Sequence, residues 1–195
     1  MSLGKQAKVL SKSQYEALLI HVSNSRHGSR NRVIIMLSVK AGFRAIEIAK
    51  LTWGMVLGAD GTVSNDIALQ DCASKGAGGR NIPIAKELHK ALSHLKSERG
   101  EVEKNERVIQ TARTDKVSAQ VIINIFYSWY RELGMMGCSS HSGRRTFITN
   151  AARKITSVGG SLRDVQSLAG HAALTTTQRY IEINSAARRR VVDLI

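Results

Sequence analysis

The chain of 195 residues has few cysteines, few aromatic residues and few acidic residues. Its two cysteines, Cys72 and Cys138, do not suggest a disulfide framework, so a reducing, cytoplasmic compartment is the default expectation. Aromatic residues make up only 5%, too few for the stacking platforms of RNA-binding and single-strand-binding modules. No segment is long and apolar enough to span a bilayer, and no amphipathic helix combines aromatic anchors with a distinct basic face. We therefore expect no membrane partner.

The signatures of nucleotide-dependent and metal-dependent phosphate chemistry are also missing. No Gly-rich loop ends in the Lys-Ser/Thr pair of a nucleotide-binding loop. No cysteine–histidine set has zinc spacing, and the 15 acidic residues are too scattered for a two-metal nuclease. We therefore expect no cofactor and no metal, and any phosphoryl chemistry must depend on cations of the protein itself.

Positive charge is what the chain has in excess. Lysine and arginine number 29, the net charge is +14, and the basic residues recur along the whole chain. Such an excess favours a polyanionic partner, either nucleic acid or an anionic membrane surface. Apolar residues make up 43%, and the length suits one domain with a real core.

Hydrophobic spacing predicts a mainly α-helical (α+β) domain with one small antiparallel β-hairpin. The first helix is expected to open with a capping box at Ser13–Glu16 and to run to about Val22. Further helices are expected at 31–39, 44–51, 85–96, 118–133, 143–153, 161–168, 175–183 and 186–194. In the helix at 44–51, Ile46, Ile48 and Ala49 are expected to face inward.

A different pattern in 60–84 predicts the hairpin. Val63, Ile67 and Leu69 favour short strands, the glycines of 76–79 favour a turn, and 81–84 is typical of a return strand. The only proline, Pro83, requires an edge position or a strand end there.

Candidate reactive side chains stand at helix starts and breaks. Arg44 follows a glycine break, and Glu47 lies one turn later on the same side of the expected helix. His141 and Arg144 stand three apart where a break meets a helix. Each pattern alone has an ordinary explanation, because such residues often form surface ion pairs or helix caps.

Two further patterns also have ordinary structural explanations when each is considered alone. His171 follows Gly170, which is expected to end a helix, and Tyr180 lies nine positions later on the next helix. A lone tyrosine on a helix is usually half-buried packing. Lys75, next to the glycine turn, is by itself an ordinary hairpin-tip lysine.

Taken together and in order, these patterns resemble the tyrosine recombinase (phage integrase) family. The segment 41–53 resembles the first arginine box, G-x-R-x-x-E-[IL]-x-x-L, and 75–83 resembles the hairpin lysine followed by R-x-[VI]-P. The segments 141–149 and 168–180 resemble the H-x-L-R-[RH]-T-F and L-G-H…T-T-Q-x-Y boxes. Four boxes in order, from about residue 12 to 190, are highly specific. Two positions depart from the family: Gly143 and Ala169 stand where leucine is usual or common.

The resemblance implies a function and a set of site residues. A member of this family cleaves and rejoins double-stranded DNA through a 3′-phosphotyrosyl intermediate, without metal or ATP. The implied catalytic residues are the nucleophile Tyr180 together with Arg44, Lys75, His141, Arg144 and His171. The arginines and His171 would stabilise charge on the phosphate, His141 would handle a proton, and Lys75 would protonate the leaving 5′ oxygen. Glu47 would orient an arginine.

The resemblance also bears on organisation and partners. Residues 1–195 are expected to form a single catalytic domain with no separate N-terminal DNA-clamping domain, either as a fragment or as a short family member such as the fimbrial phase-variation recombinases. We expect a nucleoid-associated protein of bacterial or phage origin, monomeric when free and tetrameric when it pairs DNA sites. An apolar stripe in 186–195 (Ala187, Val191, Leu194, Ile195) either packs on its own domain or docks on a neighbouring protomer.

Alternative functions remain open at this point. The same chemistry serves type IB topoisomerases, which nick and reseal one duplex. A catalytically inactive DNA-binding relative would keep the fold, although the complete set of candidate residues argues against decay. A basic RNA-binding domain lacks support, because no aromatic-rich RNA-binding motif is present.

Overall fold

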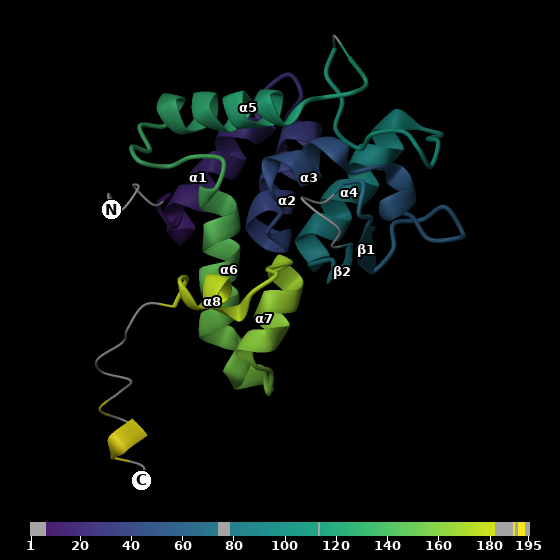
Figure 1. Cartoon of the computed structure of the whole chain (residues 1–195). Helices are drawn as coiled ribbons and strands as arrows, with labels where there is room; N and C mark the ends of the chain where they lie inside the picture. The colour runs from purple at the N-terminus through teal and green to yellow at the C-terminus, as the bar shows by residue number, and fades with distance from the viewer. Residues whose placement is uncertain (1–6, 74–78, 113, 182–188, 190, 194–195) are drawn as a thin grey trace.

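The structure is a computed structural model that describes residues 7–73, 79–112, 114–181, 189 and 191–193. These residues form helices and one two-stranded antiparallel sheet, which confirms the predicted fold class (Figure 1). The helices are α1 (Lys12–Ser23), α2 (Gly28–Ala41), α3 (Ala45–Lys50), α4 (Lys86–Arg99), α5 (Ala119–Glu132), α6 (Ser142–Lys154), α7 (Leu162–Ala169) and α8 (Leu174–Gln178). The strands are β1 (Asp66–Leu69) and β2 (Arg80–Pro83). Within the described ranges, no helix has the length and apolarity needed to cross a membrane.

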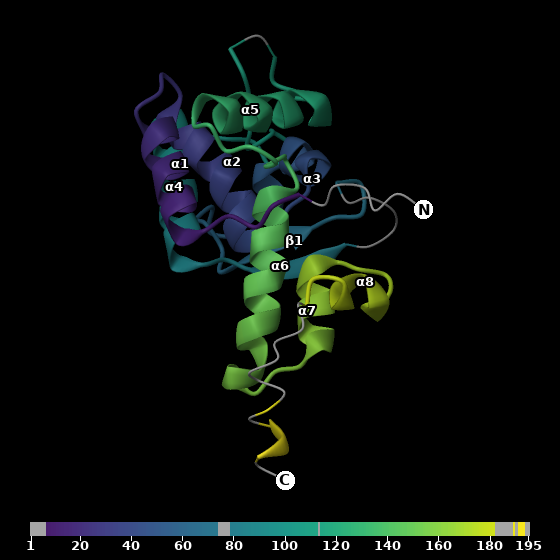
Figure 2. The same ribbon diagram turned by 90° about the vertical axis from the view of Figure 1, so that its left-hand side faces the viewer.

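Helix α2 lies at the centre of the larger part of the molecule. Its residues 33–37 are fully buried, so this stretch has no solvent-facing side. Helices α1, α3, α4 and α6 pack around it (Figure 2). A helix that is apolar on all sides must be covered on all sides, which explains the central position. The predicted buried helix and its end at Gly42 are confirmed, and the helix begins earlier than predicted, at Gly28.

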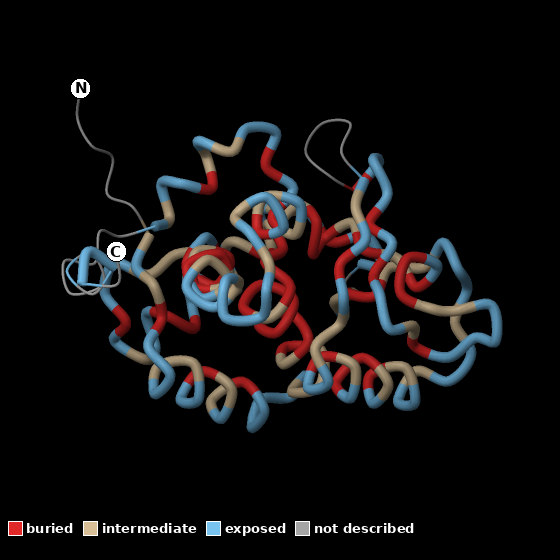
Figure 3. Tube along the Cα trace, turned by 90° about the horizontal axis from the view of Figure 1, so that it is seen from below, coloured by how far each residue is buried: buried red, intermediate tan, exposed pale blue. Residues whose placement is uncertain are grey.

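Helix α6 joins this larger part to a smaller one that contains α7 and α8. Its N-terminal turn packs on α2, while Ile148 further along lies in a second, small core with Val165 and Ala169. Figure 3 shows the buried residues concentrated inside the larger part. The smaller part therefore depends on α6 and on contacts with β2 for its position.

Gly143 is the point where α6 comes closest to α2. A Cβ atom added there would overlap Ser38 Oγ and lie 3.0 Å from Val39 Cγ2. A leucine, usual in the family at this position, would not fit unless the two helices moved apart. The departure from the family pattern thus reflects close helix packing, directly beside Arg144.

The predicted hairpin is present, but Val63, predicted as a strand residue, lies outside β1 in an isolated bridge with Leu57. Ile67 pairs with Ile82, and Pro83 ends β2 opposite Asp66. Both strands are edge strands, so a proline at a strand end leaves no ladder bond unmade. Of the predicted turn, Gly79 is described and donates its N–H to Asp71 Oδ1 at 2.5 Å; Gly76, Ala77 and Gly78 lie outside the described residues.

Three predictions about helices were also wrong. Helix α1 is capped by Ser11, not Ser13, because Ser11 and Gln14 form the reciprocal capping box one half-turn earlier. Ile46 is only partly buried, since Glu47 takes the inward position on α3 together with Ile48 and Ala49. The helix predicted at 175–183 ends at Gln178, so Tyr180 stands in the turn that follows α8.

The segment 186–195 is described only in part. Val191 and Val192 are helical and exposed. Ala187, Leu194 and Ile195 of the predicted apolar stripe lie outside the described residues.

Candidate active site

Glu47 is a fully buried carboxylate that binds two arginines. Arg44 donates from Nη1 to Glu47 Oε1 at 2.7 Å, and its backbone N–H donates to Oε2 at 2.8 Å. Arg80 donates from both Nη atoms to the two carboxylate oxygens, each at 3.0 Å. The prediction identified Glu47 as the residue that orients an arginine; the structure adds Arg80 as its second partner.

The pKa of Glu47 lies below its usual value of 4.5. Burial alone would raise it, because a low-dielectric environment disfavours the charged form. The hydrogen bonds and charge of Arg80, together with those of Arg44, outweigh that effect. Glu47 is therefore ionised at neutral pH and acts as the fixed counter-charge of the two guanidinium groups.

Three arginines from different elements converge on the C-terminal end of α7. They donate to three successive carbonyl oxygens: Arg80 Nε to Leu168 at 3.1 Å, Arg144 Nη2 to Ala169 at 2.7 Å and Arg44 Nη2 to Gly170 at 3.4 Å. The last carbonyls of a helix have no partner within the helix and carry its negative dipole end, so cations stabilise them. Gly170 closes the helix at φ +60°, where a Cβ would lie 2.8 Å from Arg80 Nη1.

Arg144 lies deepest in this cluster. Its side chain also donates from Nη1 to Gly42 O at 2.5 Å, and the residue is only 4% exposed. Burial first, and then the charge of Arg44, lower its pKa to about 10. Arg144 therefore stays protonated at neutral pH. Each Nη atom carries a second hydrogen, so the guanidinium can still donate to an incoming anion.

His171 directly follows the carbonyls that the arginines hold. Burial, then Arg144 and the other two arginines, lower its pKa to about 4, so the ring is neutral at neutral pH. Its Nδ1 lies 2.9 Å from the Thr177 hydroxyl, and its ring stacks on that of Tyr180 with centroids 5.6 Å apart. The charges of Arg144, Arg44 and Arg80 thus all act on His171.

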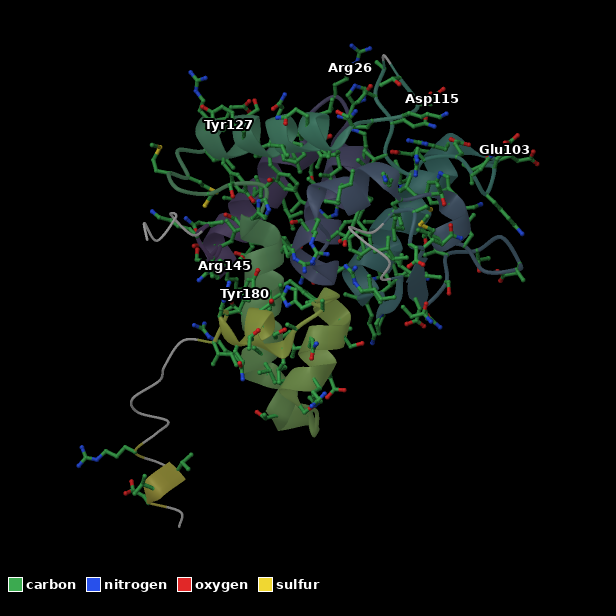
Figure 4. The ribbon with its side chains drawn as sticks, viewed as in Figure 1. Arg26, Glu103, Asp115, Tyr127, Arg145 and Tyr180 are labelled. Atoms are coloured by element: carbon green, nitrogen blue, oxygen red, sulfur yellow. The ribbon has the colours of Figure 1, made fainter. Side chains whose placement is uncertain are left out.

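Tyr180 has an aromatic neighbour on one side and a cation on another. His171 stacks on its ring, and the guanidinium of Arg145 lies 5.6 Å from the ring centroid. Figure 4 shows Arg145 and Tyr180 close together, far from Arg26 and Asp115. The turn after α8 presents Tyr180 here because Tyr180 N–H bonds to Thr177 O at 3.0 Å, one residue closer than in an α-helix.

A pocket of about 400 Å³ opens beside Tyr180. His141, Arg144, Arg145 and Arg179 contribute to its lining, so four potential cations border the tyrosine. His141 stands exposed at the N-terminus of α6, with Nδ1 3.5 Å from Ser140 Oγ. Of the predicted residues, His141, Arg144 and Tyr180 line this pocket. Arg144 and His171 connect it to the arginine cluster, which contains Arg44 and Glu47. Lys75 lies outside the described residues.

Arg80, Arg145 and Thr177 were not predicted as site residues. Arg80 had a signal in the R-x-[VI]-P pattern after Lys75, but nothing in the local sequence tied it to Glu47. Arg145 directly follows Arg144 in the sequence, and no spacing rule predicted that it would lie beside Tyr180. Among the described residues, no group of three or more His, Cys, Asp or Glu side chains forms a metal-binding arrangement.

Comparison with known proteins identifies the family to which this arrangement belongs. The model of the phage integrase family matches residues 8–187. The chain belongs to the phage integrase family. A tyrosine recombinase XerC of Herpetosiphon aurantiacus is 27% identical over 164 residues, which cover 81% of this chain and 49% of that protein.

Solved tyrosine recombinases share the fold. The crystal structure of a XerA recombinase matches with a TM-score of 0.72 and 23% identity over 95% of this chain and 64% of that one. A Tn1549 transposon integrase in complex with circular intermediate DNA matches with a TM-score of 0.77 and 17% identity over 100% of this chain and 68% of the other. The chain spans about half the length of the curated relatives it matches.

The buried charge of Glu47 predicts pH-dependent stability. A carboxylate whose pKa is depressed on folding stabilises the fold above its unfolded pKa, and this contribution is lost as the pH falls through the folded pKa. Glu47→Gln should lower the free energy of unfolding at neutral pH by about 3 kcal/mol, since it leaves Arg44 and Arg80 without their buried counter-charge. Chemical denaturation at neutral and acid pH measures both effects.

The matched control for this prediction is Glu16→Gln. Glu16 is exposed and pairs with Lys12 on the surface of α1, so its loss should change stability by less than about 1 kcal/mol. If Glu47→Gln is as stable as the Glu16 variant, the carboxylate does not hold the arginine cluster together.

Proposed function

We propose that this chain cleaves and rejoins strands of double-stranded DNA as a site-specific recombinase, through a covalent 3′-phosphotyrosyl intermediate on Tyr180. The observation that carries the proposal is the position of Tyr180 at a pocket bordered by Arg144, with its ring against His171. Family membership supports this function. The net charge of +14 supports DNA as the partner.

The arginine cluster suits the charge that develops during this reaction. Three guanidinium groups, Arg44, Arg80 and Arg144, face one carboxylate, Glu47, which leaves net positive charge at the site. Attack on a phosphodiester adds negative charge to the non-bridging oxygens. Donors held in place before the reaction stabilise that charge without reorganising, and arginine offers a planar fork that matches two phosphate oxygens.

The covalent step exchanges one phosphorus–oxygen bond for another. The Tyr180 oxygen bonds to phosphorus while the bond from phosphorus to the 5′ oxygen breaks. The phenol loses its proton, which we assign to His141 at the same pocket, and the 5′ oxygen gains one, which we assign to Lys75. His171, being neutral, donates a hydrogen bond to the phosphate instead of carrying charge.

The products of this step account for rejoining without an energy cofactor. The phosphotyrosyl bond conserves much of the free energy of the original phosphodiester. A 5′ hydroxyl from the same or another strand can attack it and release Tyr180. We propose that protomers are monomeric when free, assemble as a tetramer when two sites pair, and act in the cytoplasm at the nucleoid.

A nicked suicide duplex tests the function. Cleavage of such DNA releases a short strand, so religation fails and the covalent complex accumulates. The duplexes are drawn from DNA that flanks the coding sequence of this chain. A protein–DNA adduct on a denaturing gel is the expected result. Binding without any adduct would favour an inactive DNA-binding relative. In a second assay on a supercoiled plasmid, relaxation without strand exchange would favour a topoisomerase.

The acid role of Lys75 has its own test. Lys75→Ala should slow cleavage of ordinary DNA by about 10²–10⁴-fold, because the leaving 5′ oxygen then lacks its proton donor. DNA with sulfur at the 5′-bridging position should be cleaved by the variant nearly as fast as by the parent, since sulfur leaves without protonation. Single-turnover rates on both substrates measure this.

Lys86→Ala is the control for Lys75, because Lys86 is exposed at the start of α4. It should leave both rates unchanged. Equal slowing of the two substrates by Lys75→Ala would remove Lys75 from the acid role.

A further inference from the structure

The Thr177 hydroxyl has one hydrogen-bond partner among the described residues, and that partner is His171. Thr177 is fully buried at the C-terminal end of α8. Its Oγ1 lies 2.9 Å from His171 Nδ1. A buried hydroxyl left without a partner costs about 1–3 kcal/mol, so the contact with His171 stabilises the Thr177 hydroxyl in its buried position.

The direction of this hydrogen bond determines where His171 keeps its proton. A neutral imidazole has one N–H and one acceptor nitrogen. If Nδ1 carried the proton, the Thr177 O–H would have no acceptor among the described residues. When Thr177 donates to Nδ1 instead, both groups are satisfied and the proton of His171 lies on Nε2.

The other edge of the His171 ring is available to a ligand. Nε2 has no hydrogen-bond partner among the described residues, and it is not one of the buried polar atoms left without a partner. No described residue therefore occupies this edge of the ring with a hydrogen bond. A protonated Nε2 offers a donor to a phosphate oxygen, whereas an unprotonated Nε2 would present a lone pair to it.

We propose that Thr177 is a positioning residue, whose hydroxyl keeps His171 in the tautomer with the proton on Nε2 so that His171 can donate to a non-bridging oxygen of the scissile phosphate. The proposal rests on the proposed DNA-cleaving function. The tautomer itself depends only on the structure of the free protein, so the two parts can fail separately.

The backbone around His171 does not depend on the Thr177 side chain. The His171 N–H bonds to Gln166 O at 3.1 Å, and Gln166 Nε2 donates to His171 O at 3.0 Å. Tyr180 N–H bonds to the carbonyl of Thr177, which any residue there retains. Removing the Thr177 hydroxyl should thus change the tautomer of the His171 ring without moving the backbone of Tyr180.

Nitrogen NMR of the imidazole tests the tautomer in the free protein. The protein is labelled with ¹⁵N histidine, and the signals of His171 are assigned by their loss in His171→Gln. We expect a protonated Nε2 and an unprotonated Nδ1 in the parent and in Thr177→Ser. Thr177→Val, which keeps the shape but lacks the hydroxyl, should shift the population toward the other tautomer. A parent protein with its proton on Nδ1 overturns the proposal, whatever the variants do.

Single-turnover cleavage of the suicide duplex tests the consequence. Thr177→Val should slow cleavage by about 10-fold to 100-fold, less than the about 10²–10³-fold expected when a direct donor is deleted. Thr177→Ser should restore the rate, and Thr175→Val, at an exposed position of the same helix, should not change it. Thermal unfolding establishes that each variant is folded.

A double-mutant cycle separates positioning from packing. If Thr177 acts through His171, Thr177→Val should cause no further slowing in a His171→Gln background. Additive slowing would mean that Thr177 acts independently of His171 and would overturn the proposal. Failure of the parent protein to form any adduct would instead contradict the proposed function, while the NMR result would stand.

Discussion

Replacing Tyr180 with phenylalanine is expected to abolish the covalent protein–DNA adduct and leave DNA binding nearly unchanged. In the proposed reaction the hydroxyl is the attacking atom, so no other group of the side chain can replace it. Phenylalanine keeps the ring that stacks on His171 and lies under Arg145. The hydroxyl of Tyr180 also makes no hydrogen bond among the described residues, so its removal should not disturb the fold. Denaturing gels and duplex-binding titrations measure the two effects.

Tyr127→Phe is the matched control. Tyr127 is a 64% exposed tyrosine on α5, away from the pocket, and its variant should form the adduct at the parental rate. A residual adduct in Tyr180→Phe that maps to another residue would show that the nucleophile has been misassigned.

The spacing of apolar residues predicted most helices, because the buried side chains of a helix follow the helix's own period of about 3.6 residues. The inward face of α5 repeats every three to four residues, whereas α2 carries a continuous apolar run. Gly42 and Ser118 mark helix ends that the structure confirms. The spacing of apolar residues did not predict the C-terminal end of α8, where the backbone forms a tighter turn than an α-helix. After Gln178 the backbone bonds span three residues, and periodicity alone does not distinguish that turn from a continuing helix.

The candidate site could be predicted only in part for a related reason. Arg44 and Glu47 are three residues apart, so helical geometry alone predicts that they meet. Arg80 reaches the same carboxylate from 33 residues further along, and only the folded chain brings it there. One signal was available: Glu47 stands between two isoleucines on a short helix, and a buried carboxylate needs several donors. His171 and Thr177 meet across the turn between α7 and α8, where no sequence period applies.

The arginine cluster is built as a single unit, which makes it sensitive to small changes. Arg44, Arg80 and Arg144 hold successive carbonyls of α7 in addition to Glu47 or Gly42. Their positions are therefore determined by the fold of the free protein. Such preorganisation is what makes fixed charges effective toward a developing negative charge.

Arg144→Lys should reduce cleavage by about 10³-fold, while the charge of the site stays the same. Lysine lacks the planar fork, so one ammonium cannot serve Gly42 O, Ala169 O and a phosphate oxygen in the geometry that Arg144 provides. Because the charge is kept, DNA affinity should fall far less than the rate. Single-turnover cleavage and duplex-binding titrations measure the two.

Arg163→Lys, at an exposed position on α7, controls for the same substitution outside the cluster and should leave both quantities unchanged. Thermal unfolding of Arg144→Lys shows whether the loss of its two carbonyl contacts also weakens the fold. If the folded lysine variant cleaved at the parental rate, charge alone would suffice at this position. The planar guanidinium of Arg144 would then only hold the end of α7 close to Gly42, through its bonds to Ala169 O and Gly42 O, and would have no role in the reaction.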